Sequence, residues 1–391
     1  MTTLLAFIVV IGVLVFVHEL GHYLAARSVG VRVERFSVGF PPRFITFTSL
    51  EEGWLLQLYF YSSTLDGKLE WQPIWEKTLV VPNKTGSGTE YCLALLPLGG
   101  YVKMAGIIDE SMDTTLTHAP DEFMSKSFLS QVFVMSAGVI MNILLAFFIY
   151  TGLSYHFGKP IENPSPVVSR LVDDMPAKNA GIIPGDKIIS VNGEQIDTWK
   201  DMVHHIHNLP EKLIILEIDR QGDLITKKFT TSFDIIHSEA GLDTIGIIGI
   251  YPEIQYADIN FLEASVAGFR STTVGFGMII TSLKMLFSGE ASFKELGGPI
   301  MIAQLAGETA RAGTTYLLSF MAIISINLAF LNILPIPGLD GGHIFVAVIQ
   351  AILGRPLSIK ARMIFQQIGM VFLLLVMVTV LYNDIGRLFT N

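Results

Sequence analysis

His18-Glu19-Leu20-Gly21-His22 lies near the end of an apolar stretch that runs from Leu4 to Ala26. Residues four positions apart share one face of an α-helix, so both imidazoles can reach one metal ion. Glu19 lies beside them as the candidate base that takes a proton from water. Ionisable residues inside a membrane helix are costly, and they are functional by default. The alternative is that the three side chains hydrogen-bond to neighbouring helices, which leaves a buried carboxylate without a cation.

A second polar stretch supplies a candidate for the third ligand of a catalytic zinc, since two histidines leave such a metal one protein ligand short. Asn332-Ile-Leu-Pro-Ile-Pro-Gly-Leu-Asp340-Gly-Gly-His343 follows another apolar run. The first and third apolar runs cross a bilayer in the same direction, so their C-terminal ends lie on one side. We therefore expect Asp340 to complete the site. The alternatives are that Asp340 is a solvated turn residue or that His343, further along the loop, is the ligand.

The composition indicates a membrane protein. Of the 391 residues, 51% are hydrophobic and 16% are charged, and the mean hydropathy is +0.52. Globular chains carry about a quarter charged residues. The net charge of −9 argues against a nucleic-acid partner, because phosphate binding needs clustered Lys and Arg. Cys92 is the only cysteine, so no internal disulfide and no cysteine-based zinc site can form.

The apolar segments predict a polytopic α-helical membrane protein with four transmembrane helices. We place these in residues 1–26, 128–157, 313–340 and, with the C-terminal tail, 363–391. Met1 to Leu5 contains no Lys or Arg, so we interpret the first segment as a retained helix rather than a signal peptide. Residues 253–312 are predicted to be amphipathic and juxtamembrane. Within them, Val274–Phe287 is short, contains Lys284 and glycines, and favours an interfacial helix.

The orientation follows from arginines and lysines that flank the spans. Basic residues gather after the first and third spans, at Arg27, Arg32, Arg35, Arg43, Arg355, Lys360 and Arg362. We therefore place the loops 27–127 and 341–362 in the cytoplasm, and both termini on the other side. This orientation puts the candidate metal site near the cytoplasmic side.

Two regions outside the spans are predicted to be rich in β-structure. In the loop 27–127, residues 31–47 and 90–104 favour β-hairpins, with an inserted excursion at 49–89. Residues 163–252 are predicted to form a small α+β domain with strands at 167–172, 187–191, 212–218 and 227–231 and a helix at 198–208. Asn192-Gly193 is a turn signal within it.

Together these motifs resemble the site-2 protease family of intramembrane zinc metalloproteases, specifically its bacterial RseP-like branch. The resemblance covers nearly the whole chain. It rests on five stretches: His18–His22, Asn332–Gly342, Pro97–Met104, Ala180–Gly193, and the ending with Arg355-Pro356 and Tyr382–Asp384.

This resemblance implies hydrolysis of peptide bonds in membrane-spanning segments of single-span proteins, in a bacterial cytoplasmic membrane. It implies zinc bound by His18, His22 and Asp340, with Glu19 as general base. The substrates it implies are anti-sigma factors or signal-peptide remnants, cut after a first extracytoplasmic cleavage.

The resemblance also implies a substrate-binding role for Asn327 and Asn332, and for Gly99, Gly100 and Tyr101 in a membrane-dipping β-element. The alternative for each asparagine is a helix–helix hydrogen bond. Residues 163–252 resemble a PDZ domain, which implies capture of peptide C-termini as a further contact. Gly138 and Asn142 match a motif of the second span, although Val139 replaces the proline expected between them.

Two other function classes use the same features. A membrane metal transporter would place ionisable residues along a path through several spans, whereas here they gather at one edge. A scaffold without catalytic activity would use only its PDZ domain, and it would not need an intact His-Glu-x-x-His sequence.

Overall fold

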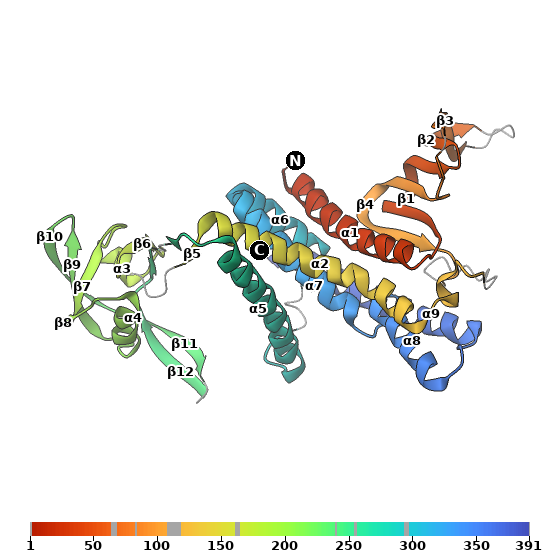
Figure 1. Cartoon of the computed structure of the whole chain (residues 1–391). Coiled ribbons are helices and arrows are strands. Elements are labelled where there is room, and N and C mark those ends of the chain that lie inside the picture. The colour runs from red at the N-terminus through yellow and green to blue at the C-terminus, as the bar shows by residue number, and fades with distance from the viewer. Residues whose placement is uncertain are drawn as a thin grey trace. The chain divides into compact units, whose positions relative to one another are not determined.

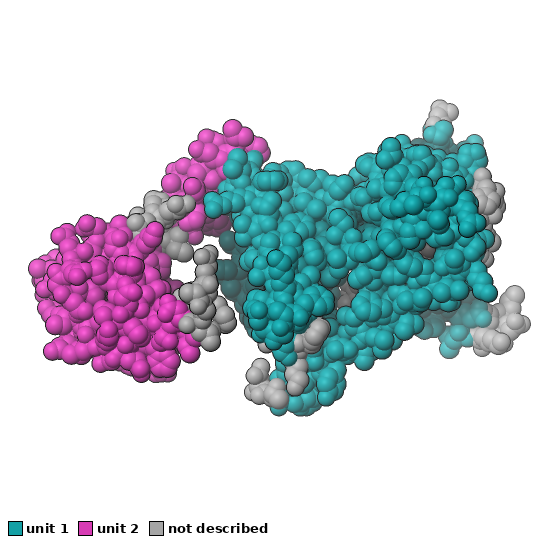
Figure 2. All heavy atoms as spheres, turned by 90° about the horizontal axis from the view of Figure 1, so that it is seen from below, with its two compact units in different colours: residues 1–153, 265–391 teal, residues 154–264 magenta. Residues whose placement is uncertain are grey.

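The computed structural model describes residues 2–63, 69–82, 84–107, 119–160, 165–238, 241–253, 256–292 and 297–390. Two compact units make up the chain: residues 1–153 with 265–391, and residues 154–264 (Figure 2). Residue 163, the predicted start of the small α+β domain, lies outside the described residues.

Four helices of the first unit are long and apolar enough to cross a membrane, which confirms the predicted number. Their spans run over Thr3–Ser28, Phe128–Phe157, Thr314–Ile333 and Ile359–Phe389. They belong to the helices α1 (Thr2–Ser28), α2 (Phe128–Phe157), α7 (Thr314–Ile333) and α9 (Ile359–Thr390). The same unit contains the 3-10 turn η1 (Phe123–Ser125) and the helices α5 (Phe261–Ser288, entering from the second unit), α6 (Pro299–Ala312) and α8 (Asp340–Leu353).

The helices α1, α6 and α7 pack together around a buried apolar core, and α2 runs beside them (Figure 1). Val10 and Leu14 of α1 contribute to this core, with Ala306 of α6 and Met321 of α7. Gly21 allows α1 and α2 to approach closely, because a Cβ there would lie 2.5 Å from the carbonyl oxygen of Ala137. This close approach places the part of α1 that carries His18 and His22 directly against α2.

A four-stranded antiparallel sheet follows α1. Its strands are β1 (Val33–Leu50), β2 (Gly53–Ser63), β3 (Leu69–Val80) and β4 (Glu90–Met104), in the order β3-β2-β1-β4. The long strand β1 bends, so that residues near Phe36 and residues near Phe47 both pair with the start of β4. The predicted excursion at 49–89 forms the β2–β3 ribbon, which extends the sheet away from α1 (Figure 1).

The C-terminal half contains one helix that the sequence did not predict. Within the segment predicted at 313–340, the spanning helix ends at Ile333, before Pro335 and Pro337, which cannot continue it. The loop predicted at 341–362 instead contains the helix α8, which Asp340 opens. In this helix Ala347 is buried, and Ile344 packs against a buried core cluster. Asp340 is therefore a first-turn residue of a helix rather than a residue in a flexible turn.

The interpretation of Val274–Phe287 as a short, broken segment is also wrong, since it forms the second half of the 28-residue helix α5. Gly275 does not interrupt the helix. A Cβ at Gly275 would lie 2.7 Å from Ile326 of α7, so the missing side chain permits close helix packing. Glycine lowers helix propensity by only about 1 kcal/mol, which tertiary packing overrides here.

The second unit is an α+β domain with its own apolar core. Its main sheet has the order β10-β9-β7-β8, and the helix α4 packs over a core that includes Ile188, Met202, Ile214 and Leu216. The remaining strands form two-stranded pairs, among them β11 with β12 and β13 with β6. In chain order the elements are β5 (Lys159–Pro160), β6 (Val168–Leu171), α3 (Pro176–Asn179), β7 (Lys187–Val191), β8 (Glu194–Gln195), α4 (Trp199–His207), β9 (Leu213–Arg220), β10 (Asp223–Thr230), β11 (Ser232–Ser238), β12 (Gly241–Ile247), β13 (Ile250–Pro252) and β14 (Tyr256–Ala257).

Candidate metal centre

One face of α1 presents both predicted histidine ligands to the interior. His18 and His22 are buried and lie one helical turn apart. Their ring centroids are 4.8 Å apart, and their Nε2 atoms lie 3.2 Å apart. The two ring nitrogens that the helix turns inward are therefore already close enough to share one ion.

Asp340 reaches the histidines because the chain breaks between α7 and α8. Pro335, Pro337 and Gly338 turn the chain, and Leu339 precedes the first turn of α8 in an extended conformation. The Oδ2 atom of Asp340 lies 3.1 Å from Nε2 of His18 and 3.2 Å from Nε2 of His22. Among the described residues, these three form the cluster of metal-ligating side chains.

The triangle formed by these three atoms fits a zinc ion. Its three sides measure 3.1, 3.2 and 3.2 Å. Zinc with tetrahedral geometry and ligand distances of about 2.0 Å separates its ligand atoms by about 3.3 Å. Oδ2 of Asp340 is buried and has no hydrogen-bond donor among the described residues. Two imidazole nitrogens and one carboxylate oxygen are also the donor set of many catalytic zinc sites.

Hydrogen bonds behind the rings fix how the imidazoles are turned. Nδ1 of His22 donates to the carbonyl oxygen of Val134, at 2.8 Å. Nδ1 of His18 lies 3.2 Å from the side-chain amide of Asn142, whose Oδ1 is otherwise buried without a partner. The two ends of an asparagine amide are interchangeable in assignment, and turning Oδ1 to His18 satisfies both groups. Both Nε2 lone pairs then face Asp340, as metal ligation requires.

Gly138 of α2 provides the space in which the rings lie. A Cβ at Gly138 would lie 2.4 Å from Nε2 of His22 and 2.6 Å from Cε1 of His18. The sequence motif of the second span contained Gly138 and Asn142, but it did not predict where these two residues lie relative to the histidines. Their roles were missed because the contact joins residues more than 110 positions apart.

Glu19 lies beside the end of β4. It is half-buried on α1, and a Cβ at Gly100 would lie 3.4 Å from its Cγ atom. The absence of a side chain at Gly100 therefore brings β4 against α1 at this level. Gly99 packs in the same way against the Phe40 ring, and the Tyr101 hydroxyl accepts a 3.1 Å hydrogen bond from Arg35. The predicted β-element residues thus lie on one strand next to the candidate base.

The two predicted asparagines of α7 occupy different environments. The side-chain amide of Asn332 lies 3.2 Å from Nε2 of His18, at the edge of the triangle. The amide of Asn327 donates to the carbonyl oxygen of Ile323 on its own helix, at 3.2 Å. The structure therefore brings Asn332, and not Asn327, to the three-residue cluster.

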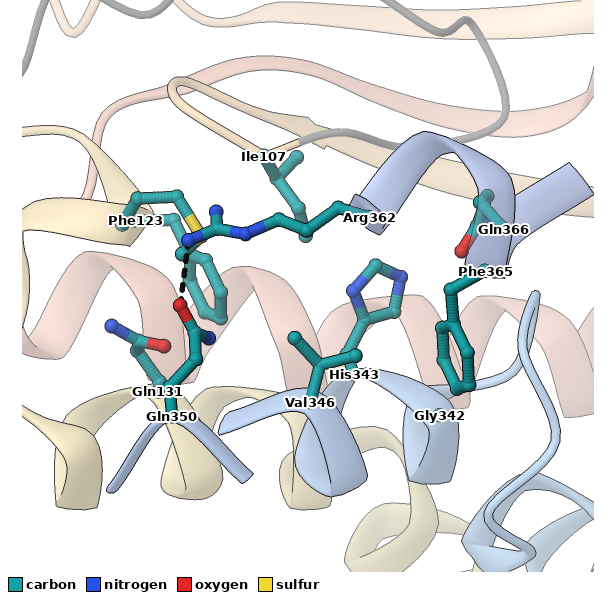
Figure 3. A pocket seen from close by; sticks show the side chains of 11 residues that line it. Ile107, Phe123, Gln131, Gly342, His343, Val346, Gln350, Arg362, Phe365 and Gln366 are labelled. Carbon is teal, nitrogen blue, oxygen red and sulfur yellow. Dashed lines mark hydrogen bonds between the residues drawn. The ribbon is translucent and has the colours of Figure 1, made fainter. Parts of the chain in front are cut away.

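His343 lies outside the triangle. It lines a pocket together with Arg362 and Gln350, and none of the three cluster residues lines that pocket (Figure 3). The Arg362 guanidinium donates a 2.6 Å hydrogen bond to Gln350 in this pocket. The geometry thus separates the two candidates for the third ligand and favours Asp340.

Comparison with known proteins identifies the family to which this chain belongs. The family model described as peptidase family M50 matches residues 6–82 and 77–376. The chain belongs to peptidase family M50. Members of this site-2 protease family are intramembrane enzymes, and this chain is a membrane zinc metalloprotease.

Relatives across bacteria match along their whole length. A protein of Rickettsia conorii, provisionally named a zinc metalloprotease, is 31% identical, and the match covers 100% of both chains. A protein of Agrobacterium fabrum with the same provisional name is 30% identical over 98% of this chain and 95% of its own. Zinc metalloprotease RasP of Bacillus licheniformis is 29% identical over 100% of both chains.

A solved structure matches a part of this M50 chain. It is the PDZ domain of an SdrC-like protein from Listeria monocytogenes, at 16% identity and a TM-score of 0.18. The match covers 23% of this chain and 87% of that domain. This likeness is too weak to carry an argument, so the interpretation of residues 163–252 as a PDZ domain stays a prediction from the sequence.

Proposed function

We propose that this M50 protease cleaves peptide bonds within membrane-spanning segments of other proteins, with zinc held by His18, His22 and Asp340. The triangle of ligand atoms with sides of 3.1–3.2 Å is the observation that carries the proposal. It lies between helices that are long and apolar enough to cross a membrane. A peptide bond that reaches these residues must therefore come from a segment within or beside the bilayer.

The chain's own residues divide the chemistry of hydrolysis among them. Zinc, when bound, supplies Lewis-acid polarisation of the scissile carbonyl and makes water more acidic. Glu19 takes the proton from the attacking water and later returns it to the leaving amine. Asn142 and the Val134 carbonyl hold the two imidazoles in the tautomer that leaves Nε2 free for the metal.

The end of β4 is suited to hold the substrate. It forms one edge of the sheet beside α1, and Gly100 lies against Glu19. A membrane-spanning helix must unwind before cleavage, because its amides are already hydrogen-bonded. An unwound segment can add to a strand edge through backbone hydrogen bonds. Asn332, at the edge of the triangle, is placed to hydrogen-bond the substrate backbone next to the scissile bond.

The test is Glu19→Gln in purified protein, with a labelled single-span substrate in a bilayer. We expect full zinc content and a loss of cleavage of about 10²–10⁴-fold, since a general base contributes that much. A chelator should abolish wild-type cleavage, and added zinc should restore it. Cleavage by Glu19→Gln at the wild-type rate would reject the assigned base. Absence of cleavage by the wild type, with metal uptake into vesicles, would instead favour the transporter.

We place the active site near the cytoplasmic side of the bacterial inner membrane, on the basis of the arginines and lysines that flank the spans. Single cysteines test this, in a background where the buried Cys92 is replaced by Ala. A cysteine at Ser358 should react with an impermeant reagent only from the cytoplasm. A cysteine at Asp223, in the second unit, should react only from the opposite side. Labelling in the reverse pattern would invert the orientation.

The second unit is proposed to act as a steric filter, which admits substrates after a first cut has removed their outer domain. It is a folded body with its own core, and two compact bodies cannot occupy one volume. Deleting residues 167–251 should then permit cleavage of untrimmed substrates and leave trimmed ones unaffected. If the unit instead captures trimmed C-termini as a PDZ-like domain, the deletion should raise the Michaelis constant for trimmed substrates. No change with either substrate would reject both roles.

A further inference from the structure

The β1–β4 sheet has two chemically different faces, which the strand register identifies. One apolar row crosses the sheet, and each of its residues pairs with the next on the neighbouring strand: Val38, Leu93, Ile45, Leu58 and Trp75. The neighbouring row, whose side chains point to the opposite face, is polar: Ser37, Cys92, Thr46, Gln57 and Glu76. The alternation therefore continues from β1 and β4 into the inserted β2–β3 ribbon.

The polar face is satisfied by its own hydrogen bonds. Gln57 accepts from the hydroxyls of Thr46 and Tyr59, at 3.4 and 3.1 Å. Its amide donates to Glu76 across the ribbon, at 3.4 Å. Trp71 at the far end donates its indole N–H to the carbonyl oxygen of Arg43, at 2.7 Å. These contacts satisfy the polar row within the sheet, whereas Tyr61 and Val80 on the same face are exposed.

The apolar face carries large side chains that the described residues leave exposed. Leu93 is 50% exposed, Trp75 49%, Phe47 42% and Leu79 41%. Lys77 and Glu70 are charged residues on this face. The long stem of Lys77 can lie along apolar surface while its ammonium reaches water. Glu70 lies near the start of β3 and is exposed. We define the apolar face by its members, namely Ile45, Phe47, Leu56, Leu58, Phe60, Trp75, Leu79 and Leu93.

This apolar face continues a surface that is already packed on a membrane helix. Tyr91 of β4 pairs with Phe36 on one side and with Phe47 on the other, so the three side chains share one face. At the Phe36 end, the face packs against α1: the Phe36 ring lies 5.9 Å from that of Phe16 and 5.6 Å from that of Tyr23. At the Phe47 end, the same face extends past α1 and is exposed.

We propose that the apolar face of the β2–β3 ribbon docks onto the lipid bilayer beside α1, and so anchors the sheet in the membrane interface. This face is continuous with the part that packs on α1, which is a candidate membrane span. The part of the face that α1 does not cover should therefore lie next to bilayer lipid. Tryptophan, here Trp75, is enriched at membrane interfaces. Exposed acidic residues of the ribbon, Glu51, Glu52, Glu70 and Glu76, outweigh Lys77 and Lys84, so apolar contact rather than attraction to anionic lipid supplies the binding.

Two adjacent positions on β3 provide a matched test, because Leu79 belongs to the apolar face and Thr78 to the opposite one, and both are exposed. Each is replaced by a spin-labelled cysteine in the Cys92→Ala full-length protein, in phosphatidylcholine nanodiscs. We expect the label at 79 to collide several-fold less with a water-soluble nickel chelate than the label at 78, and more with oxygen. High salt should leave this difference unchanged. Equal access of both labels to the nickel chelate would overturn the proposal.

A second measurement uses the native tryptophans and guards against labels that disturb the fold. The chain has four tryptophans, and Trp75 and Trp71 lie on opposite faces of β3. Variants that retain only one of these two, with Phe at the other three positions, are placed in bilayers of brominated lipid. Stronger quenching of Trp75 than of Trp71 supports docking onto lipid. Unquenched Trp75, or spin–spin broadening at position 79 that reports a second copy of the chain, would overturn it.

Discussion

Two carboxylates, the buried Asp186 and the half-buried Asp340, show the difference between a structural and a functional acid. Asp186 of the second unit is fully buried and receives two 2.8 Å hydrogen bonds from the Arg220 guanidinium, plus one of 2.9 Å from the Ile183 N–H. Asp340 of the first unit faces two imidazole nitrogens instead. The first carboxylate has its countercharge within the fold. The second faces two ring nitrogens that are placed to bind a metal, so we propose a bound cation as its countercharge.

This difference indicates what each residue does for the protein. A bidentate Arg–carboxylate pair fixes geometry and is complete without a ligand. The Asp186–Arg220 pair joins the loop before β7 to the end of β9, and it stabilises one domain. The Asp340 cluster joins α1 to α8 and leaves its charge to be neutralised from outside. Substitutions at the two sites should therefore be distinguishable by metal content, by cleavage and by local stability.

The largest expected effect comes from Asp340→Ala, which should lose both bound zinc and measurable cleavage. Removal of the carboxylate leaves two neutral imidazoles, one ligand fewer than a catalytic zinc site holds. His343→Ala is the matched control, because that side chain lines a separate pocket that none of the three cluster residues lines. Metal analysis of both purified variants checks the prediction. Zinc retained by Asp340→Ala and lost by His343→Ala would assign the third ligand to His343.

A methyl group at Gly138 should nearly match this loss, although none of the three ligand residues is replaced. Its Cβ would lie 2.4 Å from Nε2 of His22, so the rings must move and the triangle must open. We expect Gly138→Ala to lose most of its zinc and its cleavage. Gly152→Ala, on the same helix with nothing within 4 Å of the new Cβ, should behave as wild type. Wild-type zinc content in Gly138→Ala would show that the histidines are held less rigidly than the geometry implies.

A smaller effect is expected at Asn142, which supports a ligand without contacting the metal. Asn142→Ala removes the hydrogen-bond partner of His18 Nδ1 and should weaken zinc binding by about 10–100-fold. Asn327→Ala is the control, since that amide bonds to its own helix and should leave zinc binding unchanged. Competition with a zinc chelator measures both affinities. Equal affinities for the two variants would remove Asn142 from the support of the site.

The sequence was sufficient to predict the features that depend on local pattern or on chain direction. The apolar runs gave the number of spanning helices, and the helix period placed His18 and His22 on one face. The parity of the spans brought Asp340 to the same side, before any packing was known. The pattern of β-branched and aromatic residues also indicated strands in the regions that form β1, β4 and the sheet of the second unit.

Features that depend on tertiary packing could not be predicted in this way. The helix α5 continues through Gly275 because Ile326 fills the space beside it, and a single sequence does not show that neighbour. The helix α8 was missed because its apolar residues follow two prolines and read as a loop. The positions of Gly138 and Asn142 against His18 depend on how α2 packs on α1, and no spacing within one helix encodes that contact.

The next prediction concerns the structural carboxylate. Arg220→Ala leaves Asp186 buried with one hydrogen-bond donor among the described residues, the Ile183 N–H. An unsatisfied buried group costs about 1–3 kcal/mol, so the second unit should lose roughly that much stability. Arg220→Lys, which keeps the charge but not the bidentate geometry, should lose less. Hydrogen exchange of the amides in β7 and β9 measures the change, and zinc content should remain that of the wild type. Loss of zinc in Arg220→Ala would contradict the separation of the two sites.

The smallest expected effect is the dependence of the second unit's stability on pH. Burial by itself would raise the pKa of Asp186, but the hydrogen bonds and charge of Arg220 outweigh it, so the pKa lies below the ordinary value of 3.8. The folded unit therefore binds a proton less readily than the unfolded chain. The stabilisation from this residue is present above the ordinary pKa, and it is lost as the pH falls through the lowered value.

Hydrogen exchange in β7 and β9 between about pH 2 and pH 6 should show this loss in the wild type. Asp186→Asn cannot titrate, so its stability, though lower at neutral pH, should vary less over that range. An equal acid-induced loss in both proteins would show that another group carries the pH dependence.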